Sequence, residues 1–152
     1  MKITWSATVM TAVSCIILCH DNGPGYSDAL KKTKRVPVVV SWQGRVKLGL
    51  LKEAPKPGYI ADGKTWAKLW KAWRGTEEVP SVNFQEAIVL VGVNNNPNWI
   101  NVLAEIDDNG ALQLTYASTL MGFINPQEGA YEFALIRRDG IKTIAGKEIE
   151  KD

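Results

Sequence analysis

The alternation of apolar and polar residues predicts most of the regular structure in this chain. Apolar side chains occupy every second position over residues 36–42 and again over residues 46–50. A period of two is typical of a β-strand with one buried face. Gln43 and Gly44 separate the two runs as a turn, so we expect a hairpin over residues 36–50.

Further strands are predicted in the second half of the chain. Residues 88–93 form a continuous apolar run, which indicates a central strand covered on both faces. After a turn at 94–98, residues 100–106 alternate and are expected to be its antiparallel partner. A turn at 107–110 and the hairpin signal Asp139-Gly140 separate the remaining runs. Alternation continues in three more segments, at residues 112–116, 131–135 and 141–145.

One helix is predicted between these strands. Asp62 is a suitable N-cap, and Gly75 can adopt the left-handed conformation that ends a helix. Four apolar side chains fall on one helical face and are expected to pack in the core: Trp66, Leu69, Trp70 and Trp73. About seven strands, one amphipathic helix and no βαβ alternation indicate an α+β fold, a mostly antiparallel, sandwich-like domain.

Residues 1–19 have the character of an export signal. Lys2 precedes a largely apolar run that ends at Cys19, and polar residues follow. A membrane anchor is the alternative, but five Thr and Ser residues lower the hydrophobicity of the run and no basic cluster follows it directly. Ala12-Val13-Ser14-Cys15 resembles a bacterial lipobox, so Cys15 is a candidate lipidation site. The segment is therefore predicted to be a signal peptide or a lipoprotein signal.

The export signal sets the expected organisation and location of the chain. Residues 20–35 are rich in Gly, Asp and Lys and are predicted to be a flexible linker, followed by a single β-rich domain at 36–152. The domain is expected outside the cytoplasm, in the periplasm, in the cell envelope or secreted. Membrane contact is expected only through the leader or a lipid anchor. A net charge of +2 gives no indication of nucleic-acid binding.

The positions of the cysteine and histidine residues exclude several chemistries. Cys15, Cys19 and His20 are the only such residues, and all lie in or beside the leader. A processed domain then lacks a thiol and an imidazole, which excludes Ser-His-Asp and Cys-His catalysis and zinc sites built from Cys and His. The phosphate-binding patterns GxxxxGK[ST] and GxGxxG are also absent. No metal or cofactor is therefore expected.

An asparagine-rich turn is the candidate binding site. An aromatic ring beside several amides can recognise a glycan through stacking and hydrogen bonds. The structural alternative is a turn whose asparagines tolerate left-handed geometry, with the aromatic ring packed on the sheet. The residues concerned are Asn94, Asn95, Asn96, Asn98 and Trp99.

Two carboxylates leave a hydrolytic alternative. Glu105 and Asp107 share a strand face, and a pair of acids is what a glycoside hydrolase requires. Solvated acids at a strand edge and in a turn account for the same residues. A non-enzymatic role is therefore favoured over a carboxylate-dependent hydrolase.

Two stretches of the chain have a distinctive sequence: Trp-Ala-Lys-Leu-Trp at 66–70, and Pro-Ser-Val-Asn-Phe at 80–84, which leads into the apolar run at 88–93. They resemble the C-terminal domain of PrcB, an accessory subunit of a secreted bacterial protease complex. In that family the second stretch reads Pro-x-Val-Asp-Phe, so Asn83 replaces an acid here. The Gly-Gly-Tyr turn of the family is replaced by residues 94–98, so the partner-binding role of that turn is not carried over.

The resemblance, which covers residues 60–145, extends the functional prediction. It implies an exported, non-catalytic protein that associates with another exported protein. We therefore expect an accessory or regulator of an extracytoplasmic protease or envelope complex. A glycan-binding module that uses Trp99 and the asparagine turn is the alternative.

Overall fold

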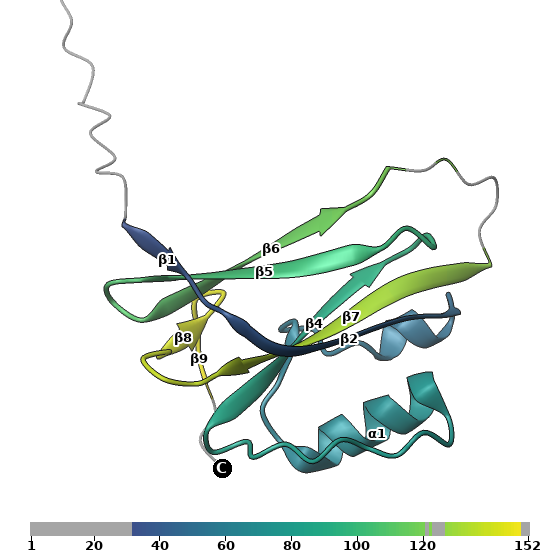
Figure 1. Ribbon diagram of the computed structural model, residues 1–152, viewed down its shortest axis with the longest axis horizontal. Helices are drawn as coiled ribbons and strands as arrows, with labels where there is room; N and C mark the ends of the chain where they lie inside the picture. Colours follow the sequence, from purple (N-terminus) through teal and green to yellow (C-terminus); the bar gives the residue numbers. More distant parts are fainter. Residues whose placement is uncertain (1–31, 121, 123–126, 150–152) are drawn as a thin grey trace, which may run out of the picture.

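The computed structural model describes residues 32–120, 122 and 127–149, which form two β-sheets and one α-helix (Figure 1). The predicted fold class, an α+β domain of mostly antiparallel strands, is confirmed. The signal predicted at 1–19, with Cys15, and residues 20–31 of the predicted linker lie outside the described residues. Nine strands rather than about seven occur in the described part, because four of them are only two or three residues long.

The first sheet has four antiparallel strands and contains the predicted central strand. Its order is β2 (Val38–Lys47), β7 (Glu128–Arg137), β4 (Ala87–Asn94) and β3 (Tyr59–Ile60). Both faces of β4 are covered, because Ile88 and Leu90 pack on one side and Val89 on the other, and none of the three is exposed. A strand covered in this way needs a continuous apolar sequence, which is the pattern that predicted it.

The second sheet has five strands and packs on the first. Its order is β1 (Thr33–Arg35), β5 (Ile100–Asp107), β6 (Ala111–Ser118), β8 (Thr143–Ile144) and β9 (Lys147–Glu148). All neighbouring strands are antiparallel except β6 and β8. The hairpin of β5 and β6 is the predicted one, and Gly110 has the positive φ of 85° that its turn requires.

Helix α1 (Gly63–Arg74) covers the face of the four-stranded sheet that points away from the five-stranded sheet (Figure 1). The predicted cap is present, since the Asp62 carboxylate accepts a hydrogen bond from the Thr65 N–H at 2.8 Å. The predicted aromatic stripe is core: Trp66, Trp70 and Trp73 are buried, and each indole N–H donates to a backbone carbonyl. The molecule therefore has three layers, one helix and two sheets.

The hairpin predicted over residues 36–50 is wrong. Strand β2 continues through Gln43 and Gly44 without a turn, and the chain then enters the 3-10 helix η1 (Leu50–Glu53). Gly44 is explained by packing instead, because a Cβ at this position would overlap the hydroxyl of Tyr131. A glycine inside a strand can mark the close approach of another group as well as a turn.

Two predicted strand pairings are also wrong. Strand β5 was expected beside β4, and residues 141–145 beside 131–135, but in both cases the chain crosses to the other sheet. Gly140 does turn the chain, with φ at 76°, and β8 then pairs with β6 and β9. Alternation predicts which face of a strand is buried. Because two packed sheets bury their inner faces against one another, a strand of either sheet shows the same alternation, and the pattern does not identify the strand that pairs with it.

The first two strands form one extended segment that changes sheets. Strand β1 pairs with the end of β5, the Val36 N–H donates to the Ala104 carbonyl at 2.9 Å, and beyond Pro37 the chain joins β7 as strand β2. The ordered structure thus includes Thr33, inside the segment predicted to be a linker. An exposed, polar edge strand buries little, so its composition resembles that of a linker.

Candidate functional site

The asparagine turn at 94–98 connects β4 of one sheet with β5 of the other. Asn94 Nδ2 donates to the Asn98 carbonyl at 3.4 Å, and the Asn98 N–H donates to Asn96 Oδ1 at 3.0 Å. The Asn96 carbonyl accepts from the Ala130 N–H, and Asn98 is buried. The side-chain amides of Asn94 and Asn96 and the backbone of Asn98 therefore shape the crossover, and Asn95 is exposed.

Trp99, by contrast, is accessible. Its side chain is 46% exposed, and the guanidinium of Arg45 lies 5.4 Å from the centre of its ring. Arg45 Nε also donates to the Pro97 carbonyl at 3.2 Å. A guanidinium stacked on an indole is a favourable cation–π contact, so Arg45 links β2 to the start of β5.

The two carboxylates of the hydrolase alternative have separate structural contacts. Asp107 is buried, and its Oδ1 accepts hydrogen bonds from the backbone N–H groups of Asn109 and Ala111, both at 2.9 Å. Glu105 is exposed and accepts from the Thr33 hydroxyl at 2.9 Å. One acid therefore holds a turn and the other joins two strands.

A third acid, which the sequence pattern did not single out, lies between the sheets. Glu132 on β7 is only 5% exposed. Its carboxylate accepts hydrogen bonds from the Ser41 hydroxyl, the Gln43 amide and the backbone N–H of Val102. The alternation of Tyr131, Phe133 and Leu135 predicts a strand but does not single out Glu132. The missed signal is that Ala130, Ala134 and Ile136, on the same face as Glu132, are all apolar and buried.

Glu132 and Gln43 replace the backbone of a missing strand. Strand β1 pairs with residues 105–107 of β5, and the chain then leaves the five-stranded sheet. Residues 100–103 of β5 therefore pair with β6 alone. The free Val102 N–H donates to Glu132, and the free Ile100 carbonyl accepts from Gln43 Nε2 at 3.3 Å. Buried backbone groups must find such partners, which explains a carboxylate between two sheets.

Strand β2 is the edge of its sheet and has an unusual surface. Its backbone pairs with β7 on one side, and no other described strand pairs with it. Val38, Val39 and Val40 are 41%, 55% and 40% exposed, and residues 36–44 carry no charge. A bulge between Val38 and Val40 interrupts the pairing with β7. Long uncharged edges are templates for pairing with another strand.

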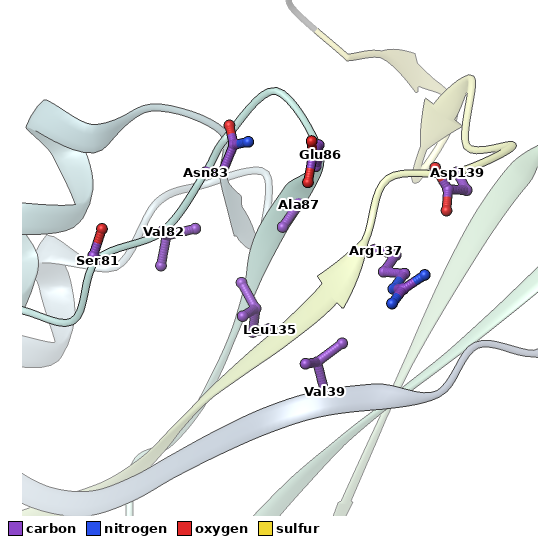
Figure 2. A pocket seen from close by; sticks show the side chains of 9 residues that line it. All are labelled: Val39, Ser81, Val82, Asn83, Glu86, Ala87, Leu135, Arg137 and Asp139. Atoms are coloured by element: carbon purple, nitrogen blue, oxygen red, sulfur yellow. The ribbon is translucent and has the colours of Figure 1, made fainter.

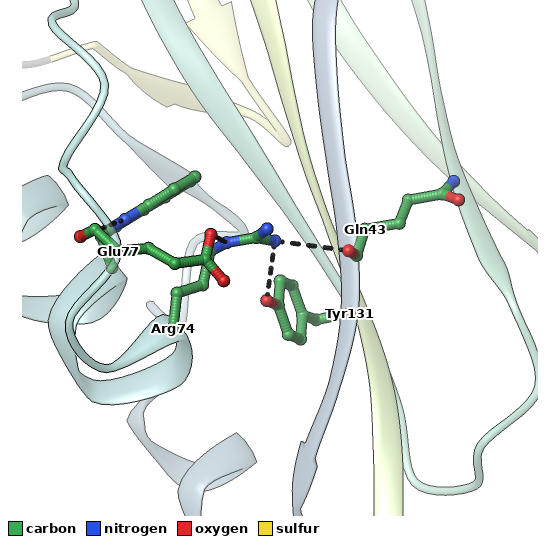
Figure 3. A network of polar contacts seen from close by, with 5 residues as sticks. Gln43, Arg74, Glu77 and Tyr131 are labelled. Atoms are coloured by element: carbon green, nitrogen blue, oxygen red, sulfur yellow. Dashed lines mark hydrogen bonds and ion pairs between the residues drawn. The ribbon is translucent and has the colours of Figure 1, made fainter.

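Polar contacts cover the same edge near Gln43 (Figure 3). Arg74, at the end of α1, donates to the Gln43 carbonyl at 3.3 Å and to the Tyr131 hydroxyl at 3.1 Å. Its Nε forms an ion pair with Glu77 at 2.7 Å. Burial raises the pKa of the Tyr131 hydroxyl, and the nearby guanidinium opposes that shift. The accessible, uncharged part of β2 is therefore residues 38–42, which we call the open half of β2.

A pocket of about 500 Å³ adjoins the open half of β2 (Figure 2). Val39 contributes to it from β2, Leu135 from β7 and Val82 from the loop before β4. Arg137 and Asp139 carry opposite charges on its lining. An extended chain lying along β2 would pass this pocket, which has apolar and polar walls and is large enough for a side chain.

Two general features of the described structure complete the picture of the site. Residues 32–120, 122 and 127–149 contain no cluster of three or more metal-ligating side chains. No helix in the same ranges combines the length and the apolar character needed to cross a membrane.

Comparison of the chain with family models, curated proteins and solved structures found no match. The fold and site therefore define a class only: a three-layer α+β domain with an open edge strand. The relation to PrcB stays a prediction from residues 66–70, 80–84 and 88–93.

Proposed function

We propose that this domain binds another exported protein by adding an extended segment of that protein to the open half of β2. The observation that supports this is a strand edge with three exposed valines, no charge and no described backbone partner. In strand addition, backbone hydrogen bonds supply affinity and pockets for alternate side chains supply specificity. The pocket beside Val39 is in position to receive one such side chain.

The ends of β2 carry the protection that the open half lacks. Natural edge strands avoid unwanted pairing through charged side chains, bulges, proline or short length. Arg45 and Lys47 provide charge at one end, and Pro37 stands at the other. The open half between them is protected only by its bulge, and this arrangement suits a partner that recognises a defined stretch of edge.

The biological role proposed on this basis is that of an accessory or regulatory subunit outside the cytoplasm. Such a subunit would hold an extended segment of a protease or of an envelope protein. The export signal at 1–19 and the resemblance to PrcB motivate this role. Strand addition gives it a physical mechanism that needs no catalytic group.

The proposal is tested by selecting peptides from a random display library on the purified domain. The best peptide is then synthesised in two N-methylated series, offset by one residue. We expect one series to lose binding and the other to keep it, because only alternate N–H groups face β2. Equal binding by both series would contradict strand addition.

Protein variants locate the binding site of the selected peptide. Val39→Lys places a charge in the open half, whereas Leu120→Lys makes the same kind of change at a side chain that is 98% exposed and outside the described strands. We expect only the first variant to lose peptide binding. Loss of binding in both, or in neither, counts against β2 as the site.

Glycan binding is kept as a second candidate because Trp99 is exposed. Among the four turn asparagines only Asn95 is exposed, and the guanidinium of Arg45 lies over the Trp99 ring. A glycan array with Trp99→Ala tests this function, with Tyr116→Ala as the control because Tyr116 is similarly exposed. Array binding that both variants retain would remove this candidate.

A further inference from the structure

We infer that the segment bound at β2 has an uncharged centre flanked on both sides by acidic residues. This inference rests on the proposed function and identifies the chemistry of the partner. Residues 32–47 contain five cations and no acid, and all five are exposed: Lys32, Lys34, Arg35, Arg45 and Lys47. The uncharged stretch at 36–44 lies between the two groups of cations.

The spacing of the cations sets the expected spacing of the acids. Arg35 and Arg45 are each five residues from Val40, at the middle of the open half. A strand rises about 3.3 Å per residue, so the backbone of each arginine lies at most about 16 Å along the chain from that point. A partner strand centred opposite Val40 would meet both cations with acids that are about ten positions apart.

Acids of the domain itself do not neutralise this edge. Glu105 lies opposite Arg35, and Glu128 lies opposite Lys47, in the neighbouring strands. Within the described residues neither pair is close enough to form an ion pair. Glu132 faces the gap between the sheets and accepts hydrogen bonds from uncharged donors. Arg45 also contacts the Trp99 ring and the Pro97 carbonyl, but no cation of residues 32–47 forms an ion pair within the described residues, so their charges are not neutralised there.

The same charges disfavour a second copy of this chain as the occupant. Two β2 strands paired antiparallel about Val40 would place Arg35 of one copy opposite Arg45 of the other, and the reverse. Like charges directly opposite one another destabilise a strand pair. A different protein segment with acidic flanks fits the edge, and a second copy does not.

The pocket is expected to select an uncharged side chain from the centre of the segment. Val39, Val82 and Leu135 supply its apolar walls, and two acids and one cation also line it: Glu86, Asp139 and Arg137. An acidic side chain would meet two like charges there, and any charged side chain would lose hydration on burial. The recognised segment is thus apolar or weakly polar where it contacts the pocket and acidic at its ends.

The inference is tested with the display-selected peptides described above and with their synthetic variants. We expect Asp or Glu to be enriched at two positions about ten residues apart, with an uncharged stretch between them. Replacing both acids with serine should weaken binding roughly tenfold at low salt and much less at high salt, because exposed charge pairs are weak and screened. Selected peptides without flanking acids would overturn the inference.

A double variant of the domain provides the matching test on the protein side. Arg35→Gln combined with Arg45→Gln removes the two cations, and Lys52→Gln combined with Lys56→Gln removes the same charge from exposed positions elsewhere. We expect the first variant alone to bind the acidic peptide roughly tenfold more weakly. Equal affinity of the two variants would overturn the inference.

These outcomes separate the inference from the proposed function. If only one N-methylated series binds but acids have no effect, strand addition stands and the acidic partner is wrong. If both series bind equally, strand addition itself is wrong. Sedimentation is the remaining check: a dimer that Val39→Lys dissociates would show that the occupant is a second copy and would overturn the acidic partner.

Discussion

Replacing Glu132 with alanine tests how the domain accommodates the change of sheet in its first strand. The carboxylate is 5% exposed and accepts hydrogen bonds from Val102 N–H, Ser41 and Gln43. Alanine leaves the buried Val102 N–H without its acceptor, which costs about 1–3 kcal/mol. Ser41 and Gln43 are exposed and can turn to water, so their loss adds less. With the cavity left by the side chain, we expect a loss of about 2–4 kcal/mol in the free energy of unfolding.

Urea unfolding of the purified domain measures this loss. Glu128→Ala is the matched control, because Glu128 lies at the exposed end of the same strand and should change stability by less than about 0.5 kcal/mol. Glu132→Gln should fall between the two, since an amide keeps one acceptor oxygen but turns its NH₂ toward donors. Amide hydrogen exchange at Val102 should accelerate in the alanine variant.

A specific pair of results would refute this account of Glu132. If Glu132→Ala is as stable as Glu128→Ala and the Val102 amide exchanges at the parent rate, the carboxylate is not replacing a strand. The buried acid would then need a different explanation, and a role in binding would be the first to test.

Three further perturbations test the core, a close approach and the helix cap. Trp66→Ala removes a buried indole on the core-facing side of α1 and should cost about 3–5 kcal/mol in urea unfolding. Gly44→Ala should cost about 1–3 kcal/mol, because its Cβ meets the Tyr131 ring, whereas Gly49→Ala, which has open space around it, should be close to neutral in the same assay. Asp62→Ala removes the N-cap of α1 and should cost about 1 kcal/mol at pH 7 by thermal unfolding. Burial acts to raise the pKa of Asp62, but hydrogen bonds from Thr65 leave that pKa below its ordinary value. Its contribution is therefore present above about pH 4 and is lost as the pH falls through the lowered pKa, so the difference between parent and variant should shrink in acid.

The sequence predicted well those elements whose pattern depends on local features or on burial, without regard to which strands are neighbours. Helix α1 was predictable because its cap and its apolar face are local features. Strand β4 was predictable because burial on both faces requires an unbroken apolar run. The pairings of β5 and β8 were not, because a strand in either sheet buries one face against the other sheet and shows the same alternation.

The candidate site was harder to predict for a related reason. Alternation indicated that Val38 and Val40 face the core, yet both are about two-fifths exposed. The alternation predicts that one face of β2 is covered along its whole length, but α1 and η1 pack only on its second half. Apolar residues that a period predicts to be buried and that the fold leaves exposed are a sign of function. The asparagine turn was visible in the sequence, but two of its four amides form hydrogen bonds within the turn itself and Asn98 is buried.

One structural cause accounts for both the buried Glu132 and the open half of β2. The segment formed by β1 and β2 pairs with one strand in each sheet. Where this segment leaves β5, backbone groups of β5 need the hydrogen bonds of Glu132 and Gln43. Where it joins β7, its outer side pairs with no described strand. Closing that side within the chain would require another strand, and Arg74 covers only the part near Gln43. A bound segment would pair with the rest, and because it binds only the folded edge it would also stabilise the change of sheet. Partner binding and the stability of β2 should therefore rise and fall together, which is a property that an incidental surface patch would not have.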